Sequence, residues 1–318
     1  MNNIKKALSS LSYLIYRIKW NFYPKYNIIS KFPFHVDIET TDACNLKCIM
    51  CVHGTTGVSN PGMIDTTFAK DLINQVASNG GYSIKFNWRG EPTLHKDLIE
   101  LVSYAKKKGI LEVQINTNGI PLNKEKIEKL IEAGLDRIIF SVDGASKEIY
   151  EKIRVGAKYK QLVDNIITLS KYKKKINATK PLIRVQMIKM TVNENEVEDL
   201  FKLWRPYVNE IKINDITDRG QGNSLSVGNK VLIGRKKCPQ PWQRMVVAYD
   251  GKVLPCCADW NFKWIIGDAS KLSLKKIWNS TKMKNIRYLI NKYKLDEFEP
   301  CKSCFSGISY NYENNTKN

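Results

Sequence analysis

The sequence predicts an α/β protein in which a partial (β/α)6 barrel precedes a small cysteine-rich domain built from a β-hairpin and helices. Strand and helix patterns alternate from residue 35 to about residue 214, and such alternation indicates parallel strands joined by helical crossovers. All eight cysteines fall in two groups, at 44–51 and at 238–304. Six strand–helix units favour an open barrel over the closed eight-stranded form.

Six short runs rich in apolar and β-branched residues are expected to be strands. They cover residues 35–41, 83–88, 111–117, 136–142, 182–190 and 210–215. The segments between them have helical periodicity, and the expected helices cover residues 66–78, 96–108, 123–133, 146–153, 159–174 and 193–205.

Polar or glycine-rich motifs follow the first four predicted strands. They are the cysteine loop from Cys44 to Cys51, then Gly90-Glu91-Pro92, Thr117-Asn118-Gly119 and Ser141-Val142-Asp143-Gly144. Asn-Gly and Asp-Gly also form ordinary turns, so one such motif alone would be weak. The carboxyl ends of parallel barrel strands meet at one rim, where barrel enzymes place their chemistry. Four motifs at that rim therefore predict a functional site.

The chain is expected to divide into five parts. These are a basic leader at 1–33, the barrel at 34–218, a Gly/Ser/Asn-rich linker at 219–230, the cysteine-rich domain at 231–308 and a polar tail at 309–318.

The leader is expected to form an amphipathic helix, because its apolar residues recur every three or four positions. We expect this stripe to cover the core, as most amphipathic helices do, with a membrane surface as the alternative. The stripe consists of Ile4, Leu8, Leu11, Ile15 and Ile18.

Composition excludes several classes of protein. No run of eighteen apolar residues exists, and the N-terminal segment has no small-residue cleavage site, so neither a membrane-spanning helix nor a secretory signal is expected. With 51 basic and 31 acidic residues the net charge is +20, which attracts phosphates, anionic lipid or acidic substrates. Lysine runs at 106–108 and 171–175 fit solvated helix faces, so nucleic-acid binding is not expected. Two metal sites in the cytoplasm fit the cysteines better than disulfides.

The spacing Cys44-x3-Cys48-x2-Cys51 is typical of iron–sulfur ligation. Three thiolates on one loop can hold three irons of a 4Fe–4S cluster and leave the fourth iron open. The alternative is a zinc site with His53 as the fourth ligand, since structural zinc takes four ligands.

In this order, the motifs resemble those of the radical S-adenosylmethionine (SAM) superfamily across residues 35–215. The resemblance implies that Cys44, Cys48 and Cys51 ligate a 4Fe–4S cluster whose open iron binds SAM. The family usually has an aromatic residue where this chain has Met50, and a thioether can fill that space.

The same resemblance assigns the contacts to SAM. Gly90 and Glu91 would receive the SAM amino group, which needs hydrogen-bond acceptors. Asn118 and Ser141 would make further polar contacts to SAM. Arg154 would pair with the SAM carboxylate, which suits the fork of a guanidinium. A surface ion pair with Glu148 or Glu151 is the alternative for Arg154.

The chemistry implied by the resemblance is reductive cleavage of SAM to a 5′-deoxyadenosyl radical, which abstracts hydrogen from an unactivated carbon. The electron would come from an external one-electron reductant such as flavodoxin or ferredoxin. The protein would orient the reactants and exclude water.

A second cysteine group contains Cys238, Cys256, Cys257, Cys301 and Cys304. Asp250-Gly251 lies between alternating apolar residues and predicts a hairpin, which would bring Cys238 and Cys256 together. The group resembles the SPASM extension of radical SAM enzymes, in its single-cluster twitch form. The spacings are similar to those of the 2-deoxy-scyllo-inosamine dehydrogenases, which oxidise an aminocyclitol alcohol.

This second resemblance implies an auxiliary 4Fe–4S cluster held by Cys238, Cys256, Cys301 and Cys304, with Cys257 as the alternative to Cys256. A four-cysteine zinc ribbon is the alternative metal site.

Together these features predict a radical SAM oxidoreductase that oxidises a sugar, cyclitol or similar small alcohol, with the auxiliary cluster as electron acceptor. A peptide or protein maturase and a sugar epimerase are the enzymatic alternatives. The leader at 1–33 is shorter than the peptide-recognition domain of many maturases, which favours a small-molecule substrate. A zinc-containing basic protein that binds nucleic acid or membrane is the non-enzymatic alternative.

Overall fold

The computed structural model describes residues 2–216, 237–292, 294, 301 and 304, with side chains from residue 11 onward. The predicted linker at 219–230 and the predicted tail at 309–318 lie outside the described residues. The five-part division of the chain stays a prediction.

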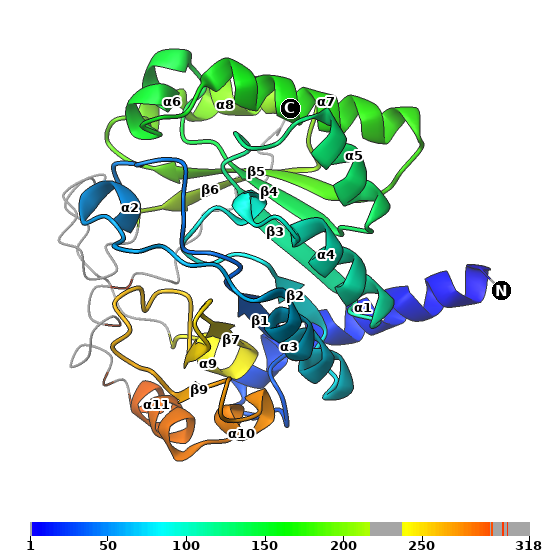
Figure 1. Cartoon of the computed structure of the whole chain (residues 1–318), viewed down its shortest axis with the longest axis vertical. Helices are drawn as coiled ribbons and strands as arrows, with labels where there is room; N and C mark the ends of the chain where they lie inside the picture. Colours follow the sequence, from blue (N-terminus) through cyan, green and yellow to red (C-terminus); the bar gives the residue numbers. More distant parts are fainter. Residues whose placement is uncertain (1, 217–236, 293, 295–300, 302–303, 305–318) are drawn as a thin grey trace, which may run out of the picture.

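The fold is organised around one nine-stranded sheet in the order β6-β5-β4-β3-β2-β1-β7-β8-β9 (Figure 1). The strands are β1 (His35–Ile38), β2 (Ser83–Lys85), β3 (Glu112–Thr117), β4 (Arg137–Ser141), β5 (Leu182–Lys189), β6 (Glu210–Asp215), β7 (Arg244–Val247), β8 (Lys252–Leu254) and β9 (Gly267–Asp268). Strands β1 to β6 pair in parallel with their sequence neighbours, as the alternation predicted. The unclosed α/β barrel is therefore confirmed.

Helices follow the strands and cover the outside of the barrel, as Figure 1 shows for α4, α5 and α7. The longer helices of the barrel are α3 (Thr66–Ser78), α4 (Leu98–Lys107), α5 (Lys124–Glu132), α6 (Lys147–Ile153), α7 (Tyr159–Lys175) and α8 (Val197–Trp204). Local capping fixes where several begin: the side chains of Asp65, Asn123 and Ser146 each accept a hydrogen bond from a backbone N–H of the first turn. Their apolar faces join one continuous core.

The predicted hairpin is confirmed, since β7 and β8 pair antiparallel around Asp250-Gly251. Gly251 has a φ of +89°, a backbone conformation that favours glycine. Sequence patterns did not reveal that β7 also pairs in parallel with β1, from His35 opposite Arg244 to Ile38 opposite Val247. The C-terminal domain therefore continues the sheet of the barrel. Short helices α9 (Gln240–Gln243), α10 (Leu274–Trp278) and α11 (Thr281–Asn291) complete it.

The N-terminal helix α1 (Asn2–Lys25) is present as predicted, but the prediction of its packed face was wrong. Tyr16 is 1% exposed and stacks on Tyr82 at 5.2 Å between ring centroids, and Trp20 meets the ring of His35 edge-on. The predicted core residues Leu11, Ile15 and Ile18 are instead 38–55% exposed. Aromatic rings bury more surface than the aliphatic stripe and decide which side of the helix packs.

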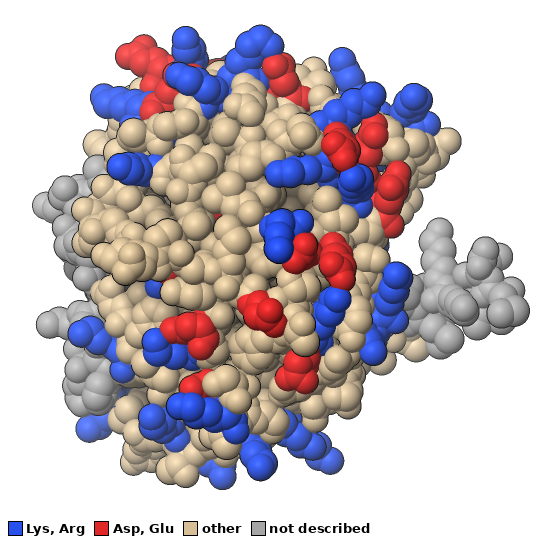
Figure 2. Space-filling view, in the orientation of Figure 1, with Lys and Arg blue, Asp and Glu red and all other residues tan. Residues whose placement is uncertain are grey.

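Basic and acidic side chains both reach the surface of the molecule. On the face drawn in Figure 2, Lys and Arg lie around the periphery, with Asp and Glu among them. No helix of the described chain combines the length and the apolarity that crossing a membrane requires.

Candidate active site

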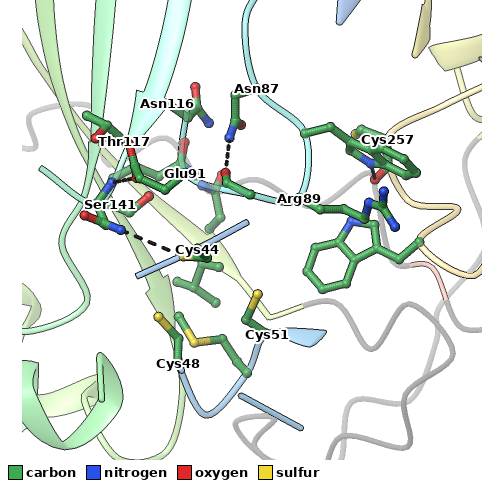
Figure 3. Close-up of a pocket in the computed structure, with 18 of the residues that line it drawn as sticks. Cys44, Cys48, Cys51, Asn87, Arg89, Glu91, Asn116, Thr117, Ser141 and Cys257 are labelled. Atoms are coloured by element: carbon green, nitrogen blue, oxygen red, sulfur yellow. Dashed lines mark hydrogen bonds between the residues drawn. The ribbon is translucent and has the colours of Figure 1, made fainter. Parts of the chain in front are cut away.

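A cavity of about 540 Å³ lies at the carboxyl ends of the barrel strands (Figure 3). All three cysteines of the first group line it, together with the ends of β2 to β6 and part of the C-terminal domain. The described lining includes Cys44, Cys48, Met50, Cys51, Lys85, Asn87, Arg89, Gly90, Glu91, Asn116, Asn118, Ser141, Arg154, Gln186, Lys212, Asn214, Cys257 and Trp260. This cavity is therefore lined by every residue predicted to contact the first cluster or SAM.

The cysteine loop is held in place by backbone contacts. The N–H groups of Lys47 and Ile49 donate to the carbonyls of Val155 and Ile153 at 2.9 and 3.1 Å. Gly54 allows the loop to fold on itself, because a Cβ there would lie 2.1 Å from the carbonyl oxygen of Cys48. The loop thus presents its three sulfur atoms to the cavity in Figure 3.

The three thiols are soft ligands of the kind that bind the irons of a cluster, and they lie in a low-dielectric setting. Burial raises the pKa of the Cys44 thiol to about 12 and also raises the pKa of Cys48. A metal must therefore displace protons to bind here. In the described ranges no three His, Cys, Asp or Glu side chains converge on a single-ion position, so the ligand assignments stay predictions. His53 lies near Asp42 and Arg89 and is not among the residues lining the cavity.

Glu91 is a buried residue of the cavity lining and ties the ends of β2 and β3 together. Its carboxylate accepts hydrogen bonds from the backbone N–H and hydroxyl of Thr93 (3.1 and 2.6 Å), the hydroxyl of Thr117 (2.7 Å) and the N–H of Asn118 (2.7 Å). Burial raises the pKa of Glu91, and these four donors offset the shift only in part. The carboxylate is thus well provided with partners from the protein itself.

Gly90 lets the neighbouring backbone approach closely. A Cβ at this position would lie 2.3 Å from the carbonyl oxygen of Thr41 and 2.6 Å from that of Ala43. The Gly90 carbonyl accepts a hydrogen bond from the side chain of Asn87 at 3.0 Å.

Asn118 and Arg154 touch the cysteine loop directly. The Asn118 side-chain amide lies 4.0 Å from the sulfur of Cys44, and the Arg154 guanidinium lies 3.7 Å from that of Cys48. Arg154 is buried and pairs with Asp143 at 2.5 Å. The alternative of a surface pair with Glu148 or Glu151 is therefore wrong. Ser141 lines the cavity at the end of β4.

Sequence reasoning missed the polar side chains that alternate along the strands and line the cavity. Lys85 ends β2 and Asn87 lies two residues further on. Lys212 and Asn214 have the same spacing on β6. Gln186 also lines the cavity, and it lies opposite Ser141 in the sheet. A spacing of two between polar residues was the available signal.

Lys212 differs from the other cations of the cavity. Lys85 pairs with Asp37 at 2.7 Å, Arg89 with Glu39 at 2.9 Å and Arg154 with Asp143. Lys212 makes no hydrogen bond or ion pair with any described residue, and burial lowers its pKa.

The second cysteine group gathers around Cys256. Burial raises the pKa of Cys256 well above its usual value, and nearby Cys257, Cys238 and Cys304 raise it further. The N–H of Cys304 donates to the carbonyl of Cys301 at 3.2 Å. Cys257 differs in lining the cavity, and the choice between Cys256 and Cys257 as the cluster ligand stays a prediction.

A contact joins the second cysteine group to the motif after β2. The indole N–H of Trp88 donates to the carbonyl of Cys257 at 3.0 Å. The Arg89 guanidinium lies 4.6 and 4.7 Å from the ring centroids of Trp88 and Phe262, and these two rings meet edge-on at 5.3 Å. Figure 3 shows Arg89 and Cys257 on the side of the cavity opposite Glu91.

Comparison with known proteins identifies both parts of the chain. Residues 38–203 match the family model of the radical SAM superfamily. The chain belongs to the radical SAM superfamily. Residues 238–305 match the SPASM iron–sulfur cluster-binding domain. The chain is therefore a radical SAM enzyme, and its family implies a 4Fe–4S cluster, SAM and further iron–sulfur chemistry in the SPASM domain. The non-enzymatic alternative is wrong.

The relatives of this radical SAM protein differ in their named activities. GTP 3′,8-cyclase of Limosilactobacillus fermentum is 33% identical over 60% of this chain and 56% of its own length. The mycofactocin maturase MftC of Mycolicibacterium smegmatis is 26% identical over 60% of this chain and 46% of its own. The chain thus spans about half the length of these curated relatives.

Solved structures confirm the fold. BtrN in complex with AdoMet and 2-DOIA has a TM-score of 0.58 at 21% identity, over 88% of this chain and 95% of that one. Streptococcus suis SuiB bound to the precursor peptide SuiA has a TM-score of 0.68 at 16% identity, over 83% of this chain and 69% of that one.

Proposed function

We propose that this enzyme oxidises the alcohol of a small polar molecule, such as a sugar or cyclitol. The observation that carries the proposal is the shared cavity: Cys44, Cys48 and Cys51 line it together with Cys257 of the SPASM domain. Its volume of about 540 Å³ lies within the usual range of ligand pockets, about 300–1,000 Å³. The likeness to BtrN, solved with 2-DOIA, supports this choice.

The residues present fit the groups that the family implies. Three soft thiols face a cavity in which Gly90 lets the backbone approach, and Asn118 and Arg154 lie beside the thiols. Cys44, Cys48 and Cys51 would hold one cluster, and Cys238, Cys256, Cys301 and Cys304 the other. When bound, the first cluster and SAM supply a carbon radical able to abstract hydrogen.

The residues of this chain would position and shield the reactants. Polar side chains on the strands, among them Gln186, Lys212 and Asn214, can bind hydroxyl or anionic groups of the substrate. Oxidation of an alcohol removes one hydrogen atom, then a proton and an electron. A fully ligated auxiliary cluster has no open iron, which favours electron acceptance over substrate binding.

Two alternative functions are each supported by a specific observation. Peptide modification is supported by the likeness to MftC and to SuiB bound to a peptide. Epimerisation is supported by Cys257, because a thiol that lines the cavity could return a hydrogen atom to the same carbon.

The test uses anaerobically reconstituted protein with SAM, a one-electron reductant and a panel of sugars and cyclitols. We expect formation of 5′-deoxyadenosine together with a ketone. Cys304→Ala should retain SAM cleavage and lose ketone formation, whereas Cys44→Ala should lose both. SAM cleavage without any two-electron oxidation would contradict the proposal. Formation of the inverted alcohol by the wild type, and loss of that product in Cys257→Ala, would favour epimerisation.

A further inference from the structure

The most prominent surface feature away from the cavity is the outer face of α1, formed by Leu11, Leu14, Ile15, Ile18 and Phe22. These side chains are 38–56% exposed and recur every three or four residues, so they lie on one side of the helix. Eight of the thirteen large apolar side chains that are exposed in the described chain fall between residues 11 and 29. Such a concentration usually marks an interaction surface.

The opposite side of α1 is already occupied. Tyr16, Trp20 and Tyr23 pack on the start of the barrel, against Tyr82, His35 and Phe34. The backbone carbonyls of Trp20 and Pro24 accept hydrogen bonds from Gln243 and Lys237. The helix is thus fixed to the body, and its outer face cannot turn inward to bury itself. Figure 1 shows α1 running along the body and projecting beyond it.

The charge next to the outer face selects the partner. Residues 1–36 contain six Lys or Arg residues and no Asp or Glu. Arg17 lies over the rings of Tyr16 and Trp20, and Lys19 donates to the hydroxyl of Tyr82 at 3.0 Å. These contacts hold cations at the edges of the apolar stripe. A second copy of the same face would bring like charges together, whereas an anionic lipid surface would neutralise them.

We propose that the outer face of α1 binds the surface of anionic membranes. The helix would lie in the interface with its apolar side chains among the acyl chains and its cations beside the headgroups. It packs where β1 and β2 begin, and the cavity lies where these strands end. Membrane binding would therefore leave the cavity accessible from the other end of the barrel.

The test is flotation of the full-length protein with vesicles of phosphatidylcholine alone or with added phosphatidylglycerol. We expect binding only to the anionic vesicles, with loss of binding at high salt. Leu14→Glu/Ile18→Glu should weaken this binding by more than about tenfold, because two apolar anchors are replaced by carboxylates that the anionic headgroups repel.

The matched control is Ile176→Glu/Leu272→Glu, which changes the charge equally at two apolar side chains that are 43% and 47% exposed elsewhere. This control should float like the wild type. Equal binding by Leu14→Glu/Ile18→Glu, or no binding to anionic vesicles, would overturn the proposal. A wild-type dimer in sedimentation that Leu14→Glu/Ile18→Glu dissociates would also overturn it and assign the face to a second copy. None of these outcomes depends on the substrate.

Discussion

At the scale of single residues, the motif after β2 works through close backbone approach and buried hydrogen bonds. Gly90 has carbonyl oxygens within 2.6 Å of where a Cβ would stand, and the Glu91 carboxylate accepts from four donors. The pattern Gly-Glu-Pro was visible in the sequence. The role that the fold gives to Glu91, tying the ends of β2 and β3 together, depends on partners 26 and 27 residues away.

Replacing Glu91 by Gln should destabilise the protein. The carboxylate faces donors only, so the amide NH2 of Gln would oppose at least one N–H or O–H and leave buried groups unpaired. We expect a loss of about 1–3 kcal/mol in the free energy of unfolding, measured by urea denaturation. The control Glu148→Gln changes an exposed side chain and should stay within about 0.5 kcal/mol of the wild type. Equal stability of the two variants would show that the four bonds contribute little.

At the scale of elements, buried charges join the barrel to the SPASM domain. Asp37 on β1 accepts from Lys85 on β2 at 2.7 Å and from Arg244 on β7 at 3.1 Å. Burial alone would raise the pKa of Asp37, but the two cations outweigh burial and hold the pKa well below its usual range. The pair of cations thus fastens three neighbouring strands.

Removing this charge with Asp37→Asn should cost about 3–5 kcal/mol at neutral pH, because Asp37 is fully buried and the half-buried Lys85 and Arg244 would lose their counter-charge. The folded pKa of Asp37 is below the unfolded value of about 3.9, so this stabilisation is present above that pH and is lost as the pH falls below it. The difference between variant and wild type should therefore shrink in acid. Urea denaturation across pH measures it, with the exposed Asp164→Asn as control. A difference independent of pH would contradict the assignment.

At the scale of the whole molecule, the two family domains share one sheet. Strand β7 continues the barrel beside β1, and Trp88 links the motif after β2 to Cys257. The two family models match separate stretches of sequence, 38–203 and 238–305. The division of the sequence into two family domains therefore does not make these domains independent folding units.

We expect the barrel and the SPASM hairpin to unfold in one cooperative transition. Hydrogen exchange followed by mass spectrometry in increasing denaturant should show peptides from β3–β4 and from β7–β8 losing protection at the same concentration. Frayed helix ends provide the internal control, because they exchange early in any case. Earlier exchange of β7–β8 would show that the shared sheet does not couple the domains.

The sequence by itself determined the α/β class, the six barrel strands, the hairpin and the location of the four motifs at one rim of the barrel. These features depend on local periodicity and on residues a few positions apart. Only the tertiary structure decided that β7 pairs with β1, that Gln186, Lys212 and Asn214 face the cavity, and that α1 packs through its aromatic side. Strand register and the choice of packed face depend on partners far away in the chain, which local patterns do not contain.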